Sequence, residues 1–304
     1  MPRIKIGTRG SPLALAQAHE TRDRLVAAHG MDAADIEIIA ISTTGDQVKD
    51  RPLAEIGGKG LFTKEIEDAL MAGQIHLAVH SMKDMPAVLP PGLIIAAILP
   101  REDARDAFMS LTAASLDDLQ QGAVLGSSSV RRTAQVLRLR PDLTSVQFRG
   151  NVQTRLRKLS EGVADATFLA CAGLNRLGLA DKITMAMPVD LMLPAIAQGA
   201  IGIEIREDDD VTRALLAKIN HSESATAIAC ERAFLQTLDG SCRTPLAGHA
   251  TLTGDRLNFR GHALTLDGVH CFETTRVGSI GDAAEMGRDA GAEVKARGGA
   301  LIAF

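Results

Sequence analysis

Residues 76–86, HLAVHSMKDMP, change from an apolar run to polar side chains within a few positions. The apolar part predicts a short buried strand, and Pro86 cannot continue a central strand. Ligands of open α/β sheets gather beyond the carboxyl ends of the strands. Ser81, Lys83 and Asp84 therefore stand where a hydroxyl, an ammonium and a carboxylate can act on a substrate. A solvated surface turn explains the same three residues equally well, so this stretch alone leaves both interpretations open.

The sequence on both sides of this stretch alternates between strand and helix patterns. A first strand is expected at residues 4–7, and Ser11 and Pro12 suit the N-cap and the first position of a helix that ends at Gly30. Further buried strands are expected at residues 36–41, 75–79, 93–99, 123–125, 146–148, 166–170 and 201–205. This alternation favours α/β domains with largely parallel sheets.

The pattern changes in the last third of the chain. Residues 250–277 consist of short alternating strands with turns, which predicts a small antiparallel sheet. We therefore expect an α/β protein with three domains. They are α/β domain 1 at residues 1–99 and 200–220, α/β domain 2 at residues 100–199, and an α+β domain 3 at residues 221–304. The charged segment 100–106 is the first boundary, and residues 44–60, rich in glycine and charge, are expected to form a mobile lid.

The composition excludes several classes of partner. The 304 residues contain 33 Lys and Arg against 37 Asp and Glu, a net charge of −4, so nucleic-acid binding is not expected. No apolar run reaches the ~18 residues of a membrane helix and residues 1–5 do not begin a secretory signal, so we expect a cytoplasmic protein that does not bind membranes. The four cysteines form no Cys-x-x-Cys pair and the eight histidines show no metal-ligand spacing, so no metal site is expected.

Cations recur where a strand or loop passes into a predicted helix. They are Arg9, Lys83, Arg131, Arg132, Arg149 and Arg176, and Arg155 lies in the first turns of its helix. A cation at a helix N-terminus opposes the helix dipole, so helix stability does not explain Arg131 and Arg132. A polyanionic ligand explains the set, because guanidinium groups bind carboxylates and phosphates through paired hydrogen bonds. Each arginine taken singly is equally well explained as a solvated surface residue.

Cys242 differs from the other three cysteines in its surroundings. It lies in a glycine-containing loop next to Arg243, and such surroundings favour a reactive thiolate. Cys171, Cys230 and Cys271 are expected to be structural. An inert loop cysteine is the alternative interpretation of Cys242.

Six segments together resemble the porphobilinogen deaminase family, in the order expected along the chain. They are GTRGSPLAL (7–15), VHSMKD (79–84), SSSVRR (127–132), FRGNV (148–152), LPAIAQG (193–199) and GSC (240–242). The resemblance implies two doubly wound lobes like those of type II periplasmic binding proteins, which enclose the site, and a third domain that carries the cysteine loop. It also implies an enzyme that condenses four porphobilinogen molecules head to tail into the linear tetrapyrrole hydroxymethylbilane and releases ammonia.

The resemblance assigns roles to individual residues. A dipyrromethane primer, made from the same substrate, is held by a thioether to Cys242. Asp84 is the catalytic carboxylate, expected to stabilise the cation left by loss of ammonia, to accept the pyrrole N–H bonds and also to mediate proton transfer. Phe62 matches a position that stacks on a pyrrole ring. The growing chain gains an acetate and a propionate at every step, which the row of cations would balance. The residues assigned to cofactor and substrate binding are Arg9, Ser11, Lys59, Phe62, Ser81, Lys83, Ser127, Ser129, Arg131, Arg132, Arg149, Arg155, Gly173, Arg176 and Gln198.

The partners that follow from the resemblance are small molecules. Porphobilinogen is the expected substrate, the chain is expected to be a monomer, and the resemblance leaves room for handover of the product to the next enzyme of the pathway. The alternative function is a non-catalytic, two-lobed module that binds an anion or an effector. Such a module would need the arginines but has no use for Asp84 beside Lys83 or for Cys242, so the enzyme is the preferred interpretation.

Overall fold

The computed structural model describes residues 4–47, 61–240 and 244–302. The chain divides into two compact units, Met1–Glu102 with Ala200–Ala225 and Asp103–Gly199 with Thr226–Phe304. The second boundary falls inside helix α9 (Ser222–Thr237). The second unit contains both an α/β sheet and an antiparallel sheet, and the division into three domains stays a prediction.

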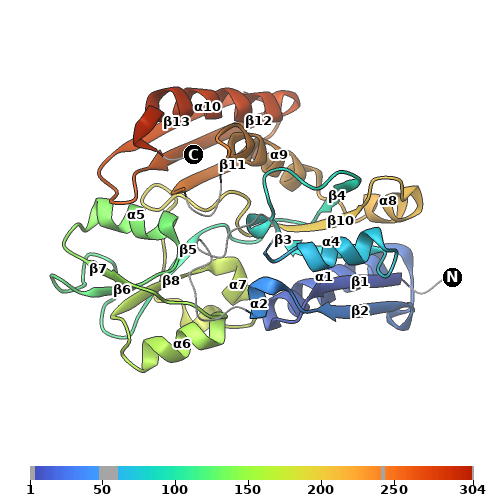
Figure 1. The fold of residues 1–304 in the computed structure, drawn as a ribbon, viewed down its shortest axis with the longest axis horizontal. Helices are drawn as coiled ribbons and strands as arrows, with labels where there is room; N and C mark the ends of the chain where they lie inside the picture. Colours follow the sequence, from blue (N-terminus) through green and yellow to red (C-terminus); the bar gives the residue numbers. More distant parts are fainter. Residues whose placement is uncertain (1–3, 48–60, 241–243, 303–304) are drawn as a thin grey trace. The chain divides into compact units, whose positions relative to one another are not determined.

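The first unit is built on a five-stranded sheet in the order β2-β1-β3-β10-β4 (Figure 1). Its strands are β1 (Ile4–Arg9), β2 (Ile36–Ile41), β3 (Leu77–Ser81), β4 (Leu93–Ile98) and β10 (Ile201–Arg206). β1 is parallel to β2 and β3, but β10 is antiparallel to both of its neighbours. The sheet is therefore mixed, because the chain re-enters this unit at residue 200 and β10 inserts between two strands that were formed earlier in the sequence.

Helices cover both faces of this sheet. The helical elements are α1 (Pro12–His29), η1 (Ala33–Asp35), α2 (Thr44–Gln47), α4 (Lys64–Met71), η2 (Met82–Asp84) and α8 (Asp210–Ala217). Side chains of α1 and α8 pack with Leu77 and Val79 on one face, and side chains of α4 pack with Ala78 on the other. Because side chains alternate along a strand, His80 leaves β3 on the α4 face.

The second unit contains a five-stranded sheet in the order β7-β6-β8-β5-β9. Its strands are β5 (Asp106–Ser110), β6 (Val124–Gly126), β7 (Thr144–Val146), β8 (Ala166–Ala170) and β9 (Met185–Ala186). β5 is antiparallel to β8 and to β9, so this sheet is also mixed. Helix α5 (Val130–Leu139) covers one face, whereas α6 (Val152–Ser160) and α7 (Cys171–Arg176) cover the other, and η3 (Ala180–Lys182) follows (Figure 1).

The same unit holds the predicted antiparallel sheet, which is confirmed. It has the order β11-β12-β13 and is followed by a long helix. The elements are β11 (Leu246–Thr253), β12 (Arg256–Leu264), β13 (Cys271–Ser279), η4 (Ile280–Asp282), α10 (Ala283–Gly298) and η5 (Gly299–Leu301). Phe234 of α9 packs against Phe259 of β12, with ring centroids 5.1 Å apart.

Two local predictions from the sequence are wrong, and a third lies mostly outside the described residues. Asp106, expected in a charged crossover, instead begins β5 and is fully buried. Arg176, expected at the start of a helix, is the last residue of α7, because α7 begins at Cys171 directly after β8. Of the expected lid, residues 44–47 form α2, and residues 48–60 lie outside the described residues. Within the described ranges, no helix combines the length and apolar character that crossing a membrane requires.

Candidate functional site

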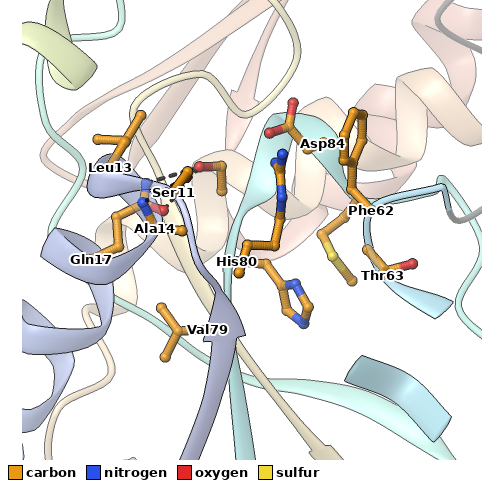
Figure 2. A pocket seen from close by; sticks show the side chains of 12 residues that line it. Ser11, Leu13, Ala14, Gln17, Phe62, Thr63, Val79, His80 and Asp84 are labelled. Atoms are coloured by element: carbon orange, nitrogen blue, oxygen red, sulfur yellow. Dashed lines mark hydrogen bonds between the residues drawn. The ribbon is translucent and has the colours of Figure 1, made fainter. Parts of the chain in front are cut away.

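A hollow of about 60 Å³ lies at the carboxyl ends of β1 and β3 in the first unit. β1 ends at Arg9 and β3 ends at Ser81, which places their last side chains at one edge of the sheet. Five predicted site residues line the hollow, namely Arg9, Ser11, Phe62, Ser81 and Asp84, and Figure 2 labels Ser11, Phe62 and Asp84 among them. The structure thus brings these five residues, distant in the sequence, to one hollow at this edge of the sheet, and their functional roles stay predictions.

Asp84 lies at the end of η2, the short turn that follows β3. Its side chain is exposed, and no hydrogen bond joins it to another of the described residues. Met82 anchors the turn, since it is 1% exposed and its N–H donates to the Ala200 carbonyl over 3.0 Å. Gly202 of β10 leaves room for Met82, because a Cβ at that position would lie 2.0 Å from the Met82 sulfur. The turn is thus fixed while its carboxylate is available to a ligand.

Arg9 and Phe62 form one wall of the hollow. The guanidinium carbon of Arg9 lies 4.1 Å from the centroid of the Phe62 ring, a cation–π contact. Arg9 therefore covers one face of the ring that was predicted to stack on a pyrrole. Ser11 is the N-cap of α1, where its Oγ accepts from the Ala14 N–H over 3.3 Å. The hydroxyl of Ser11 thus has a structural role beside its predicted one.

Ser81 is held by Gln17, a residue that the sequence analysis missed. Gln17 Nε2 donates to Ser81 Oγ over 2.9 Å, and Ser81 Oγ lies 3.0 Å from Gln17 Oε1. Gln17 projects from α1 and is 4% exposed. Lys83 lies in η2 next to Asp84 and is half-buried, but it does not line the hollow.

Arg131 and Arg132 meet a carboxylate of the chain itself in the second unit. Arg131 donates to both oxygens of Asp106, over 2.7 and 3.1 Å, and Arg132 donates to Oδ1 over 2.7 and 2.9 Å. Arg131 also donates to the Leu193 carbonyl and Arg132 to the Phe168 carbonyl. The anion that these arginines contact in the structure is therefore Asp106 of the chain itself, and the binding of a ligand by Arg131 and Arg132 stays a prediction.

Asp106 connects three predicted site residues. Gln198, fully buried, donates to the same Oδ1 over 3.2 Å and so joins the two arginines. Burial by itself raises the pKa of Asp106, but the charges of Arg131 and Arg132 outweigh it and hold that pKa well below its usual range. The sequence analysis missed this residue because a single aspartate in a run of charges has no distinguishing pattern.

The other arginines of the second unit that were predicted to bind a ligand lie near helix termini. Arg149 precedes α6, and its Nη1 is buried with no hydrogen-bond partner among the described residues. Arg155 Nε donates to the Gly150 carbonyl over 2.9 Å, and Arg176 Nη1 donates to the Gly199 carbonyl over 3.1 Å. A buried guanidinium N–H without a partner requires an acceptor, so Arg149 is the cation best suited to an external carboxylate.

The other predicted residues have local roles or lie outside the described residues. Ser129 is the N-cap of α5, where its Oγ accepts from the Arg132 N–H, and Ser127 exchanges hydrogen bonds with the Ser129 backbone. Gly173 is buried inside α7. Lys59 and Cys242 lie outside the described residues. Within the described ranges, no three His, Cys, Asp or Glu side chains are placed to hold a metal ion.

Two family models match the chain. The first is described as "Porphobilinogen deaminase, dipyromethane cofactor binding domain" and matches residues 4–214. The second is described as "Porphobilinogen deaminase, C-terminal domain" and matches residues 225–296.

Curated relatives cover nearly the whole chain. The porphobilinogen deaminase of Paracoccus denitrificans is 60% identical over 97% of this chain and 94% of the relative. The chloroplastic porphobilinogen deaminase of Pisum sativum is 57% identical over 97% of this chain and 82% of the relative. Among solved structures, the VFT2 domain of BvgS from Bordetella pertussis is similar with a TM-score of 0.43 at 17% identity, over 72% of this chain and 86% of that one. On the family models and the relatives at 57–60% identity, the chain belongs to the porphobilinogen deaminase family.

Proposed function

We propose that the chain condenses four porphobilinogen molecules, head to tail, into hydroxymethylbilane with release of ammonia. The observation that carries the proposal is the carboxylate of Asp84, exposed and without a partner among the described residues, in the same hollow as Arg9 and Phe62. This hollow lies within the segment that the cofactor-domain model matches. The curated relatives are named as enzymes, which weighs against the alternative of a non-catalytic anion-binding module.

Asp84 supplies the charge that the reaction needs. Loss of ammonia from the aminomethyl group leaves a cation that is delocalised over the pyrrole ring. A carboxylate about 4 Å from a unit positive charge contributes about 4 kcal/mol at an effective dielectric constant of about 20. A stabilisation of that size, if it acts mainly in the transition state, corresponds to roughly a thousandfold in rate.

The arginines of the second unit that were predicted to bind a ligand have the charge needed to bind the carboxylates of the cofactor. When bound to Cys242, a dipyrromethane supplies the pyrrole carbon to which the first substrate is joined, and it carries carboxylate side arms. The buried Nη1 of Arg149, which has no partner among the described residues, is suited to donate a hydrogen bond to such a carboxylate. Arg131 and Arg132 together bring two positive charges to one Asp106 carboxylate, so the cluster keeps a net charge of about +1 for an external anion.

The test is turnover of porphobilinogen by the wild-type chain and by Asp84→Asn. We expect the wild type to release four molecules of ammonia for each hydroxymethylbilane, and the variant to lose roughly 100–1000-fold in kcat. Asp68→Asn is the matched control, because Asp68 is an exposed carboxylate on α4 of the same unit. Near-wild-type turnover by Asp84→Asn would refute the role of Asp84, and an inactive wild type would refute the function.

We also propose that the enzyme works as a monomer in the cytoplasm and passes its product to the next enzyme of the pathway. Analytical ultracentrifugation of the full chain tests the first part. A concentration-independent monomer mass is expected, and a stable dimer at assay concentrations would contradict it.

A further inference from the structure

His80 and Glu204 form a buried pair beside the hollow, and the function described above makes no use of it. His80 Nε2 lies 3.0 Å from Glu204 Oε2, and the two residues are 6% and 0% exposed. In the antiparallel pairing of β10 with β3, Glu204 lies opposite Ala78, two residues before His80. Both side chains therefore leave the sheet on the same face.

Glu67 of α4 lies against the same face of the sheet. Glu67 is 8% exposed; burial raises the pKa of its carboxyl above the ordinary value, and the negative charge of Glu204 raises it further. Glu67 Oε1 and Glu204 Oε1 are both buried without a hydrogen-bond partner among the described residues. Leaving a buried polar atom unsatisfied costs about 1–3 kcal/mol. Packing alone therefore does not explain why three ionisable side chains meet here.

His80 borders the same hollow as Asp84 (Figure 2). Its Nε2 faces Glu204, and its other ring nitrogen, Nδ1, has no partner among the described residues. When the Nε2–H donates to Glu204, Nδ1 carries the lone pair that can accept a proton. A carboxylate behind a histidine fixes this tautomer and stabilises the imidazolium that forms.

We propose that His80 accepts the proton that a pyrrole carbon loses at each condensation, and that Glu204 is its positioning residue. The inference rests on the proposed function. The carbon–nitrogen bond of the protonated aminomethyl group breaks with its electron pair going to nitrogen, which leaves as ammonia. A carbon–carbon bond then forms at a pyrrole carbon that carries hydrogen. The C–H bond breaks, its electron pair restores the aromatic ring, and the proton passes to His80 Nδ1 and from there to ammonia or water.

This arrangement divides the chemistry between two side chains. Asp84 balances the positive charge as a carboxylate, and the imidazole of His80, rather than Asp84, takes the proton as the general base at every turnover. The charged groups around His80 are Glu204 on β10 and Glu67 on α4, with Arg9 and Asp84 bordering the hollow from β1 and η2.

The experiment compares His80→Asn and Glu204→Gln with the wild type, using porphobilinogen deuterated at its free pyrrole carbon. If His80 takes the proton, its loss makes C–H cleavage limiting. We then expect kcat of His80→Asn to fall about 100–10,000-fold and the isotope effect on kcat to rise above that of the wild type. Glu204→Gln should show the same changes to a smaller degree. His76→Asn is the control, because His76 precedes the other end of β3, where its Nδ1 accepts from the Lys5 N–H over 3.0 Å.

A second measurement does not depend on turnover. In protein labelled with ¹⁵N in its histidine side chains, one Nε2–H resonance should show a hydrogen bond to a carboxylate, disappear in His80→Asn and shift in Glu204→Gln. Circular dichroism establishes that both variants are folded. Folded variants with wild-type isotope effects would overturn the inference and leave the proposed function standing, whereas absence of turnover in the wild type would refute both.

Discussion

Replacement of Asp106 by asparagine should strongly destabilise the second unit. Asp106 is fully buried, and the two arginines that it binds are 5% and 6% exposed. Asparagine keeps the size of the side chain but removes its charge, which leaves two guanidinium groups buried side by side. Removing one partner of a buried ion pair costs about 3–5 kcal/mol. For a folded unit of about 150–250 residues, each kcal/mol lost from the free energy of unfolding lowers Tm by about 2–4 °C. We therefore expect Asp106→Asn to lower Tm by roughly 6–20 °C.

The pH dependence of this effect provides an independent signature. Burial raises the pKa of Asp106, but the charges of Arg131 and Arg132 outweigh it and hold the pKa far below that of an aspartate in the unfolded chain. A depressed pKa means that the carboxylate stabilises the fold fully above about pH 4 and loses this effect as the pH falls further. The difference in Tm between wild type and variant should therefore be constant from pH 5 to pH 8 and shrink below pH 4.

The assay is differential scanning calorimetry of the intact chain across this pH range. Glu161→Gln serves as the control, because it removes an exposed pair on α6 in which Arg157 Nη1 lies 3.1 Å from Glu161 Oε1. Such surface pairs contribute only about 0.3–0.5 kcal/mol. If Asp106→Asn changes Tm no more than this control, or by the same amount at pH 3 as at pH 7, Asp106 is not the counter-charge of the buried arginines.

Two further substitutions test one predicted feature in each of the two units. Arg149→Gln should raise KM for porphobilinogen about 10–150-fold, because a charged hydrogen bond contributes about 1.5–3 kcal/mol; an unchanged KM in steady-state kinetics would remove Arg149 from the site. Gly202→Ala should lower kcat more than it raises KM, since the added methyl group collides with Met82 and displaces the turn that carries Asp84. Wild-type kcat in that variant would show that the position of the turn does not matter for the chemistry.

The fold was largely predictable because the hydrophobic periodicity of the chain is local information. Apolar runs such as 36–41 and 201–205 are strands, and the alternating pattern after residue 250 is the antiparallel sheet. Strand direction was not predictable in the same way. β10 runs antiparallel to its neighbours where the chain returns to the first unit, and the local sequence of this strand does not indicate its direction.

The site was predictable where chemistry follows directly from a strand end. Arg9, Ser81 and Asp84 follow apolar, strand-forming runs within a few positions, and they border one hollow. The sequence analysis missed the buried carboxylates that pair with residues distant in the sequence, namely Asp106 and Glu204. Asp106 is one charge among several in its segment, whereas Glu204 did carry a signal, because it is the only charged residue within the apolar run 201–205. An isolated carboxylate inside a buried strand requires a partner, and that partner is His80.

The intact mass of the freshly purified chain tests most directly the central claim that condensation takes place on a primer attached to Cys242. We expect a mass above that of the 304-residue chain by one dipyrromethane, and further increases by whole pyrrole units after brief exposure to porphobilinogen. Cys242→Ser should show neither increase. An unmodified mass in protein that turns porphobilinogen over at full rate would contradict the claim.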